Sequence, residues 1–151
     1  MPYKAFPPVE QVRSVLDSIC EPEKLINSRK LRYQYYKDVY ERLSAGNTSV
    51  PEGLSYQQTA VLLGDLCLIP VPFEFFAEIS LRIREYSGMQ HVLCLSCANG
   101  YNGYLPTEDQ LCRGGYEVDV FRYGSVFSLA DNTDANLIRE ILRIIRNGED
   151  R

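Results

Sequence analysis

Residues 61–75 read VLLGDLCLIPVPFEF, and the predicted architecture is arranged around them. Two short apolar runs flank Gly64-Asp65, a pair that suits the tight turn of a β-hairpin. Pro70 and Pro72 end the second run, because proline cannot donate a hydrogen bond within a strand. The sequence therefore predicts a two-stranded hairpin over residues 56–71.

A helix and a further strand are predicted after the hairpin. Apolar residues at helical spacing indicate a helix from about Phe73 to Tyr86, with Glu74 in its first turn as a favourable neighbour of the helix N-terminus. The run from His91 to Cys97 is almost continuously apolar, which is typical of a buried strand.

Two helices are predicted before the hairpin. Apolar stripes indicate one helix over residues 9–19 and another over residues 31–43. Asn27-Ser28 is expected to cap the second helix, and Gly46-Asn47 suits its C-terminal end.

The C-terminal half is predicted to hold a loop, strands and a last helix. The loop runs from residue 99 to 117 and contains one helical turn at Thr107, and residues 118–129 alternate well enough for one or two strands. Asp134 opens the last helix and Gly148 follows its end.

This order of elements predicts a mixed sheet with helices packed on it. The fold class is α/β, at the border with α+β. A chain of 151 residues can bury a sizeable core, so residues 1–151 are expected to form one domain.

Charge and composition disfavour several kinds of partner. The net charge of −4 gives no electrostatic reason to expect nucleic acid or an anionic membrane. We see neither the apolar run of a signal peptide nor about 18 consecutive apolar residues, so we expect a soluble protein without a membrane span. Five cysteines, an odd number, favour a reducing compartment such as the cytoplasm over a disulfide framework.

Cys94 and Cys97 have a C-x-x-C spacing, and with His91 and Cys112 they make a ligand set that zinc accepts. A strand argues against such a site, because residues three apart on a strand point to opposite faces. Free cysteine is also commonly a small buried apolar residue. His91 is the only histidine, which excludes a two-histidine metal motif and makes catalysis by His91 the less favoured interpretation.

Residues 29–37 interleave basic and aromatic side chains, as surfaces that bind single-stranded nucleic acid do. The acidic balance of the chain favours another interpretation. We expect a helix whose tyrosines pack against the core and whose basic side chains are solvated.

The segment from Asn99 to Glu117 is the main candidate for function. It is rich in glycine and tyrosine, lacks a hydrophobic period and follows an apolar strand, as binding loops do. If the strands before Glu74 and Asn99 are parallel neighbours, Glu74 and Tyr104 both emerge at the carboxyl edge of the sheet. Open α/β sheets bind ligands at that edge.

Four stretches occur in a familiar order and spacing. They are GDL (64–66), IPVPFEF (69–75), LRIRE (81–85) and the loop from NGYNGY (99–104) to GYE (115–117). This pattern resembles the neutral, non-lysosomal ceramidase family, over the C-terminal part of its catalytic domain only. The resemblance is clearest over residues 64–117.

The resemblance implies a zinc-dependent amidase. In ceramide-cleaving members, two histidines from the N-terminal part hold the metal together with a glutamate and a tyrosine from the part represented here. The glutamate falls on Glu74 and the tyrosine on Tyr104, so Tyr104 and the neighbouring Tyr101 are the catalytic candidates. Zinc lowers the pKa of a bound water to about 7 and polarises the amide carbonyl.

The chain departs from this family in two respects. Neither histidine ligand is present, since His91 matches no ligand position, and Phe73 stands where the family often has glycine. The resemblance therefore implies a C-terminal half or subunit that is inactive alone and acts on a lipid-like N-acyl substrate such as ceramide. It would pair with a histidine-bearing half or self-associate, through an exposed apolar sheet edge or face.

Two other functions stay open. A stand-alone, non-catalytic interaction or ligand-binding module with a ceramidase-like half-fold would be a monomer with a closed surface. A structural zinc domain would lose its metal when Cys94 or Cys97 is changed to serine and would keep it in Glu74→Gln.

Overall fold

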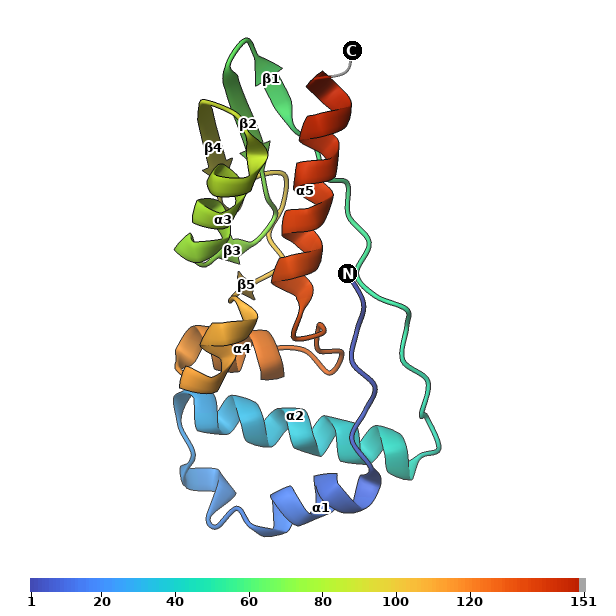
Figure 1. The fold of residues 1–151 in the computed structure, drawn as a ribbon. Helices are drawn as coiled ribbons and strands as arrows, with labels where there is room; N and C mark the ends of the chain where they lie inside the picture. The colour runs from blue at the N-terminus through green and yellow to red at the C-terminus, as the bar shows by residue number, and fades with distance from the viewer. Residues whose placement is uncertain (150–151) are drawn as a thin grey trace.

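The computed structural model describes residues 1–149 and has two packed parts, a sheet covered by helices and a group of helices at one end (Figure 1). The three-stranded sheet has the order β1-β2-β4, formed by Val61–Leu63, Leu66–Pro70 and His91–Leu95. Strands β1 and β2 are antiparallel, and β2 and β4 are parallel. The predicted mixed α/β class is thus confirmed.

The hairpin predicted over residues 56–71 is confirmed in its turn and its pairing. Leu63 pairs with Leu66 across the turn. Gly64 has φ 62°, a conformation that a residue without a Cβ adopts at little cost.

The helix predicted from Phe73 begins later, and Glu74 does not lie in its first turn. Helix α3 spans Ala77–Ser87, and Glu74–Phe75 form the short strand β3, which pairs in parallel with β5, Tyr104–Leu105. The backbone amide of Glu74 donates to the carbonyl of Gly103 at 2.9 Å. In the first turn of a helix the amide of Glu74 would have no intrahelical partner, whereas in the strand it is paired. The helix therefore starts after the strand.

The buried strand predicted over residues 91–97 is an edge strand that ends at Leu95. Its side chains alternate between the two faces, and Val92 is buried while Leu93 is 45% and Leu95 38% exposed. Its apolar run therefore reflects two apolar faces, of which the described residues cover only one.

The two N-terminal helices are confirmed as α1, Val9–Asp17, and α2, Asn27–Ser44, with the 3-10 turn Pro22–Lys24 between them. Helix α2 begins at Asn27 itself and has no side-chain cap, so the predicted Asn27-Ser28 cap is wrong. Gly46 lies just past its end with φ 78°, as expected.

The tyrosines of α2 pack against another helix. The Tyr35 and Tyr123 rings lie 5.3 Å apart, and the Arg32 guanidinium lies 5.8 Å from the centres of the Tyr36 and Tyr123 rings. Tyr123 belongs to α4, Tyr116–Tyr123, which lies between α2 and the sheet in Figure 1. This arrangement agrees with the expectation for residues 29–37, which is a helix with packed tyrosines and solvated basic side chains.

The strands predicted over residues 118–129 are wrong, because α4 takes up residues 118–123 and residues 124–129 form only an isolated bridge, from Leu129 to Tyr3. Val118 and Phe121 are buried three residues apart, which is the spacing of one helix face. The predicted helical turn is present as the 3-10 helix Glu108–Arg113. The last helix, α5, spans Thr133–Glu149 and includes Gly148, which was expected to follow its end.

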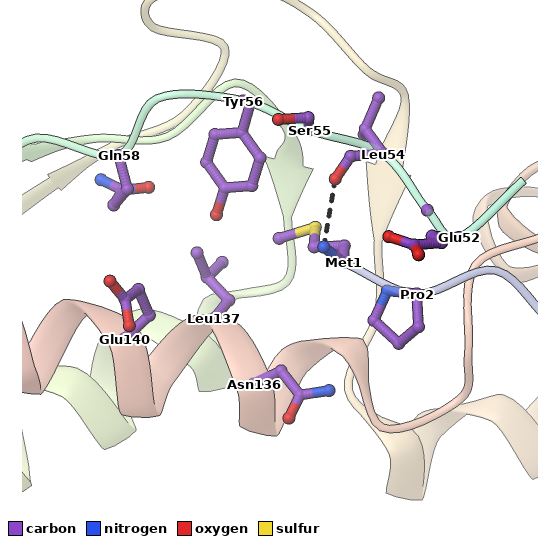
Figure 2. A pocket seen from close by; sticks show the side chains of 11 residues that line it. Met1, Pro2, Glu52, Leu54, Ser55, Tyr56, Gln58, Asn136, Leu137 and Glu140 are labelled. Atoms are coloured by element: carbon purple, nitrogen blue, oxygen red, sulfur yellow. Dashed lines mark hydrogen bonds between the residues drawn. The ribbon is translucent and has the colours of Figure 1, made fainter.

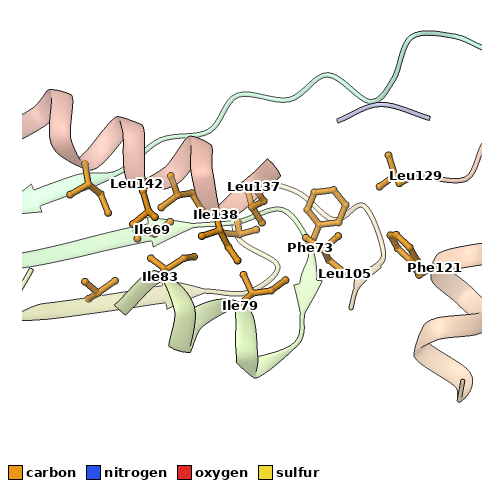
Figure 3. Close-up of a cluster of buried hydrophobic side chains, with 14 of the residues drawn as sticks. Ile69, Phe73, Ile79, Ile83, Leu105, Phe121, Leu129, Leu137, Ile138 and Leu142 are labelled. Carbon is orange, nitrogen blue, oxygen red and sulfur yellow. The ribbon is translucent and has the colours of Figure 1, made fainter. Parts of the chain in front are cut away.

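The core lies on one side of the sheet, where α3 and α5 meet β2 (Figure 3). Ile138 and Leu142 of α5 face Ile69 of the sheet, and Ile79 and Ile83 come from α3. Complete burial of an aliphatic side chain of this size contributes about 1.5–3 kcal/mol. Fully buried members of the core include Cys67, Ile69, Phe73, Ile79, Ile83, Leu105 and Ile145.

The opposite face of the sheet is exposed on β1 and β4, half-buried on β2, and almost entirely aliphatic. Its strand partners form three rows, which are Leu63, Leu66 and His91, then Val61, Leu68 and Leu93, then Pro70 and Leu95. Leu63 is 58% and Val61 45% exposed. We call these eight residues the aliphatic face. Such a face on a parallel pair is unusual, because parallel strands are normally covered on both sides.

No helix within residues 1–149 combines the length and the apolar character that crossing a membrane requires.

Candidate functional site

The site is built on the pairing of β3 with β5. Glu74 lies directly opposite Tyr104 in this parallel ladder, although 30 residues separate them in the sequence (104 − 74). Strand partners point to the same face, so the carboxylate and the phenol are neighbours. The strands that lead to these residues, β2 and β4, are also parallel neighbours, as the sequence argument required.

The glycine- and asparagine-rich loop bends back onto the end of the sheet. Asn102 donates its amide to the carbonyl of Pro72 at 2.7 Å. Gly100 has φ 132°, and a Cβ on it would lie 3.4 Å from the Cβ of Pro72. Asn99 adopts φ 62°, which asparagine tolerates better than most residues. The composition of the loop is therefore what positions Tyr104 beside Glu74.

Tyr104 lies in a cluster of phenols and carboxylates. Its ring meets that of Tyr116 edge-on, with 6.1 Å between centroids. Partial desolvation raises the pKa of Tyr104, and the nearby charge of Glu74 raises it further, followed by Tyr101 and Tyr116. Tyr101 itself is 62% exposed. The structure thus brings all three residues singled out in the sequence, Glu74, Tyr101 and Tyr104, into one neighbourhood.

The donor set of this cluster could fill only part of a metal shell. A carboxylate and a phenol oxygen are ligands that zinc accepts, and zinc sites in proteins use three or four protein ligands. Within residues 1–149, no group of three or more histidine, cysteine, aspartate or glutamate side chains could hold a metal ion. Glu74 and Tyr104 fit the role of two ligands, and further donors would have to come from elsewhere.

Phe73 does not crowd this cluster. Its side chain is completely buried and meets the ring of Tyr56 edge-on at 5.9 Å. Its carbonyl accepts hydrogen bonds from the amide of Cys97 at 3.0 Å and from the Ser96 hydroxyl at 2.9 Å. Phe73 and Glu74 thus point to opposite sides of the strand, and the phenylalanine anchors the site to the core.

The cysteines and His91 are not gathered into a site. His91 lies on the aliphatic face, with its Nε2 3.6 Å from Oδ2 of Asp65. Cys94 is half-buried, and burial raises the pKa of its thiol to about 11, whereas Cys97 and Cys112 are exposed free thiols. A raised pKa opposes the thiolate that zinc ligation needs.

A pocket lies away from Glu74 and Tyr104, between residues 1–2, residues 52–58 and α5 (Figure 2). It encloses about 670 Å³. The amine of Met1 donates to the carbonyl of Leu54 at 3.1 Å. Burial and the charge of Glu140 raise the pKa of Tyr56 to about 12. Sequence patterns gave no sign of this pocket, because three distant segments line it.

Comparison with known proteins bears on the fold. A solved structure described as "Ceramidase complexed with C2" is similar to this chain, with a TM-score of 0.53 and 23% sequence identity. The chain has a ceramidase-like fold. The match covers 62% of this chain and 15% of the solved ceramidase chain, so the ceramidase-like fold described here spans a small part of that protein. No family model matches the sequence, and no curated protein matches it.

Proposed function

We propose that this chain is the C-terminal half or subunit of a ceramidase-like zinc amide hydrolase. Glu74 and Tyr104 are its contribution to the metal shell, and a histidine-bearing half completes that shell. The substrate is a lipid-like N-acyl compound such as ceramide. The observation that carries this proposal is the register of β3 and β5, which pairs Glu74 with Tyr104.

The residues of the site have separable roles in this proposal. When bound, zinc would supply Lewis-acid polarisation of the amide carbonyl and acidify a water. Glu74 presents an anionic oxygen, and Tyr104 presents a phenol oxygen whose pKa is raised by partial desolvation and by the charge of Glu74. Tyr101 is exposed beside them, and in this proposal it contacts the substrate.

The aliphatic face supports the proposed partner half. Leu93 and its neighbours expose an uncharged surface on the parallel pair of β2 and β4, and Leu63 extends this surface onto β1. Such surfaces mark sites of protein contact. The solved ceramidase carries its matching region within a much longer chain. A partner that packs on the aliphatic face and supplies metal ligands would account for both the incomplete donor set and the exposed face.

The test is zinc binding by the chain alone and by the chain co-purified with the histidine-bearing half of a ceramidase. We expect stoichiometric zinc and hydrolysis of a short-chain N-acyl substrate only in the pair. Glu74→Gln and Tyr104→Phe should lose both in the pair, while the neighbouring controls Glu117→Gln and Tyr116→Phe keep the zinc. Stoichiometric zinc with hydrolysis by the isolated chain contradicts the proposal, as does retention of zinc by Glu74→Gln in the pair.

The alternative is a non-catalytic binding module with the same half-fold. The incomplete donor set within residues 1–149 favours it. This alternative predicts that the isolated chain is monomeric, and that co-purification with a histidine-bearing half fails.

A further inference from the structure

Strand β4 lies at the edge of the three-stranded sheet, and alternate residues of it are bonded to β2 (Figure 1). The amide of His91 donates to the carbonyl of Asp65 at 3.2 Å, and the carbonyl of Leu95 accepts from the amide of Val71 at 2.9 Å. The residues of odd number in β4 thus turn their backbone groups towards β2. Successive residues of a strand turn these groups to opposite sides, so residues 92 and 94 turn theirs away from the sheet.

The outward groups of Val92 and Cys94 form an incomplete ladder. The carbonyl of Val92 accepts a hydrogen bond from Nε of Arg84 at 3.2 Å. The amides of both residues and the carbonyl of Cys94 have no hydrogen-bond partner within the part of the chain that the structure describes. Such groups are a template for a further strand, and protein edges are usually protected by lysine, proline or a bulge. The segment His91–Leu95 contains none of these.

Space for a further strand lies beside this edge. Arg84 is on the outer side of β4, because its side chain binds the outward carbonyl of Val92. A hollow of about 500 Å³ is lined by Arg84 and Val92 together with Leu93 of the aliphatic face. Arg84 forms no ion pair with the side chains of residues 1–149, so its charge is open to a carboxylate.

The edge of β4 is continuous with the aliphatic face. Leu93 and Leu95 belong to that face and are exposed, while Val92 and Cys94 between and before them turn their backbone groups to the edge. A polypeptide that covers the face therefore reaches the edge directly. The region that matches the solved ceramidase makes up 15% of that chain, so most of such a protein lies outside the part described here.

We propose that the histidine-bearing half docks by adding a strand to the outer edge of β4, so that one sheet continues through both halves. This inference rests on the proposed hydrolase and specifies how its halves join. The added strand pairs with the outward groups of Val92 and Cys94 and places a carboxylate beside Arg84. A second copy of this chain suits the edge less well, because two-fold pairing about Leu93 would bring two Arg84 side chains into one interface.

Hydrogen exchange of single amides, followed by NMR on the ¹⁵N-labelled full chain, tests this docking without a substitution. In the dilute isolated chain, the amides of Val92 and Cys94 should exchange at least about tenfold faster than the amide of Leu93, which faces β2. The histidine-bearing half of a ceramidase, added with zinc, should slow both at least about tenfold.

The outcomes separate this inference from the proposed hydrolase. Unchanged exchange of Val92 and Cys94 in a pair that binds zinc overturns the strand addition and leaves the hydrolase standing. Failure of the two halves to pair overturns both. Protection of the two amides by raising the concentration of the isolated chain would assign the edge to a second copy and overturn the choice of partner.

A proline substitution tests the same edge through affinity. Cys94→Pro removes an outward amide and leaves the bonds to β2 in place, and Cys94→Ser is its control because it keeps the amide. In calorimetric titration with the histidine-bearing half, Cys94→Pro should pair at least about tenfold more weakly, and Cys94→Ser less than about threefold more weakly. Equal affinities for two folded variants overturn the proposal. If circular dichroism shows that Cys94→Pro is unfolded, the exchange measurement decides.

Discussion

Single residues define the candidate site through one strand pair. Glu74 and Tyr104 were paired in the sequence argument by their position after two strands and by resemblance, and the structure places them opposite each other. Strands β3 and β5 could not be predicted, because two residues are too few to show a period of two. The direction of Phe73, into the core and away from the site, was also beyond sequence reasoning.

The electrostatic coupling of this pair is testable in the metal-free chain. Because an anionic neighbour opposes phenolate formation, Glu74→Gln should lower the pKa of Tyr104 towards the ordinary value of about 10. The measurement is an NMR titration of tyrosine labelled with ¹³C at Cζ, with Tyr104→Phe to assign the resonance. Glu117→Gln should lower the same pKa less, since Glu117 contributes after Glu74. An unchanged pKa in Glu74→Gln would show that the two side chains do not interact.

At the scale of elements, patterns that extend over many residues were more informative than patterns in short segments. The apolar stripe of α5 identified it as a helix, because 17 residues sample the helical period several times, and its start was predicted at Asp134, one residue after the observed Thr133. Residues 118–123 of α4 were mistaken for strand, since Val118 and Val120 alternate locally while burial follows Val118 and Phe121. Strand β4 was predicted as buried because an apolar run does not reveal which of its faces is covered.

The two faces of the sheet should differ in their effect on folding. Ile69 is completely buried beneath α5, so Ile69→Ala should lower the free energy of unfolding by about 2–5 kcal/mol. Leu93 lies on the aliphatic face with 45% of its surface exposed. Leu93→Ala should therefore change the free energy of unfolding by less than about 1 kcal/mol. Urea denaturation of the isolated chain measures both. A larger loss for Leu93→Ala than for Ile69→Ala would mean that the described sheet faces are assigned the wrong way round.

For the whole molecule, an exposed aliphatic sheet face predicts self-association of the isolated chain. Replacing Leu63 with lysine puts a charge on the edge strand β1 of that surface, so Leu63→Lys should raise the monomer fraction in sedimentation velocity. Leu81→Lys is the matched control, because Leu81 is similarly exposed, at 57%, but lies on α3. Equal monomer fractions for Leu63→Lys and Leu81→Lys would mean that the chain associates through a different surface.

The register of β3 and β5 has a consequence for how this chain tolerates insertions and deletions. Twenty-eight residues lie between Phe75 and Tyr104, and only their ends are tied by the β3–β5 pair (103 − 75 = 28). Removing one residue from the loop just before Tyr104 would set a different side chain opposite Glu74 and turn the phenol to the other side of the strand. Substitutions in the loop that keep its backbone shape leave this alignment intact. The length of the segment from Asn99 to Gly103 is therefore constrained more tightly than the identity of its exposed side chains.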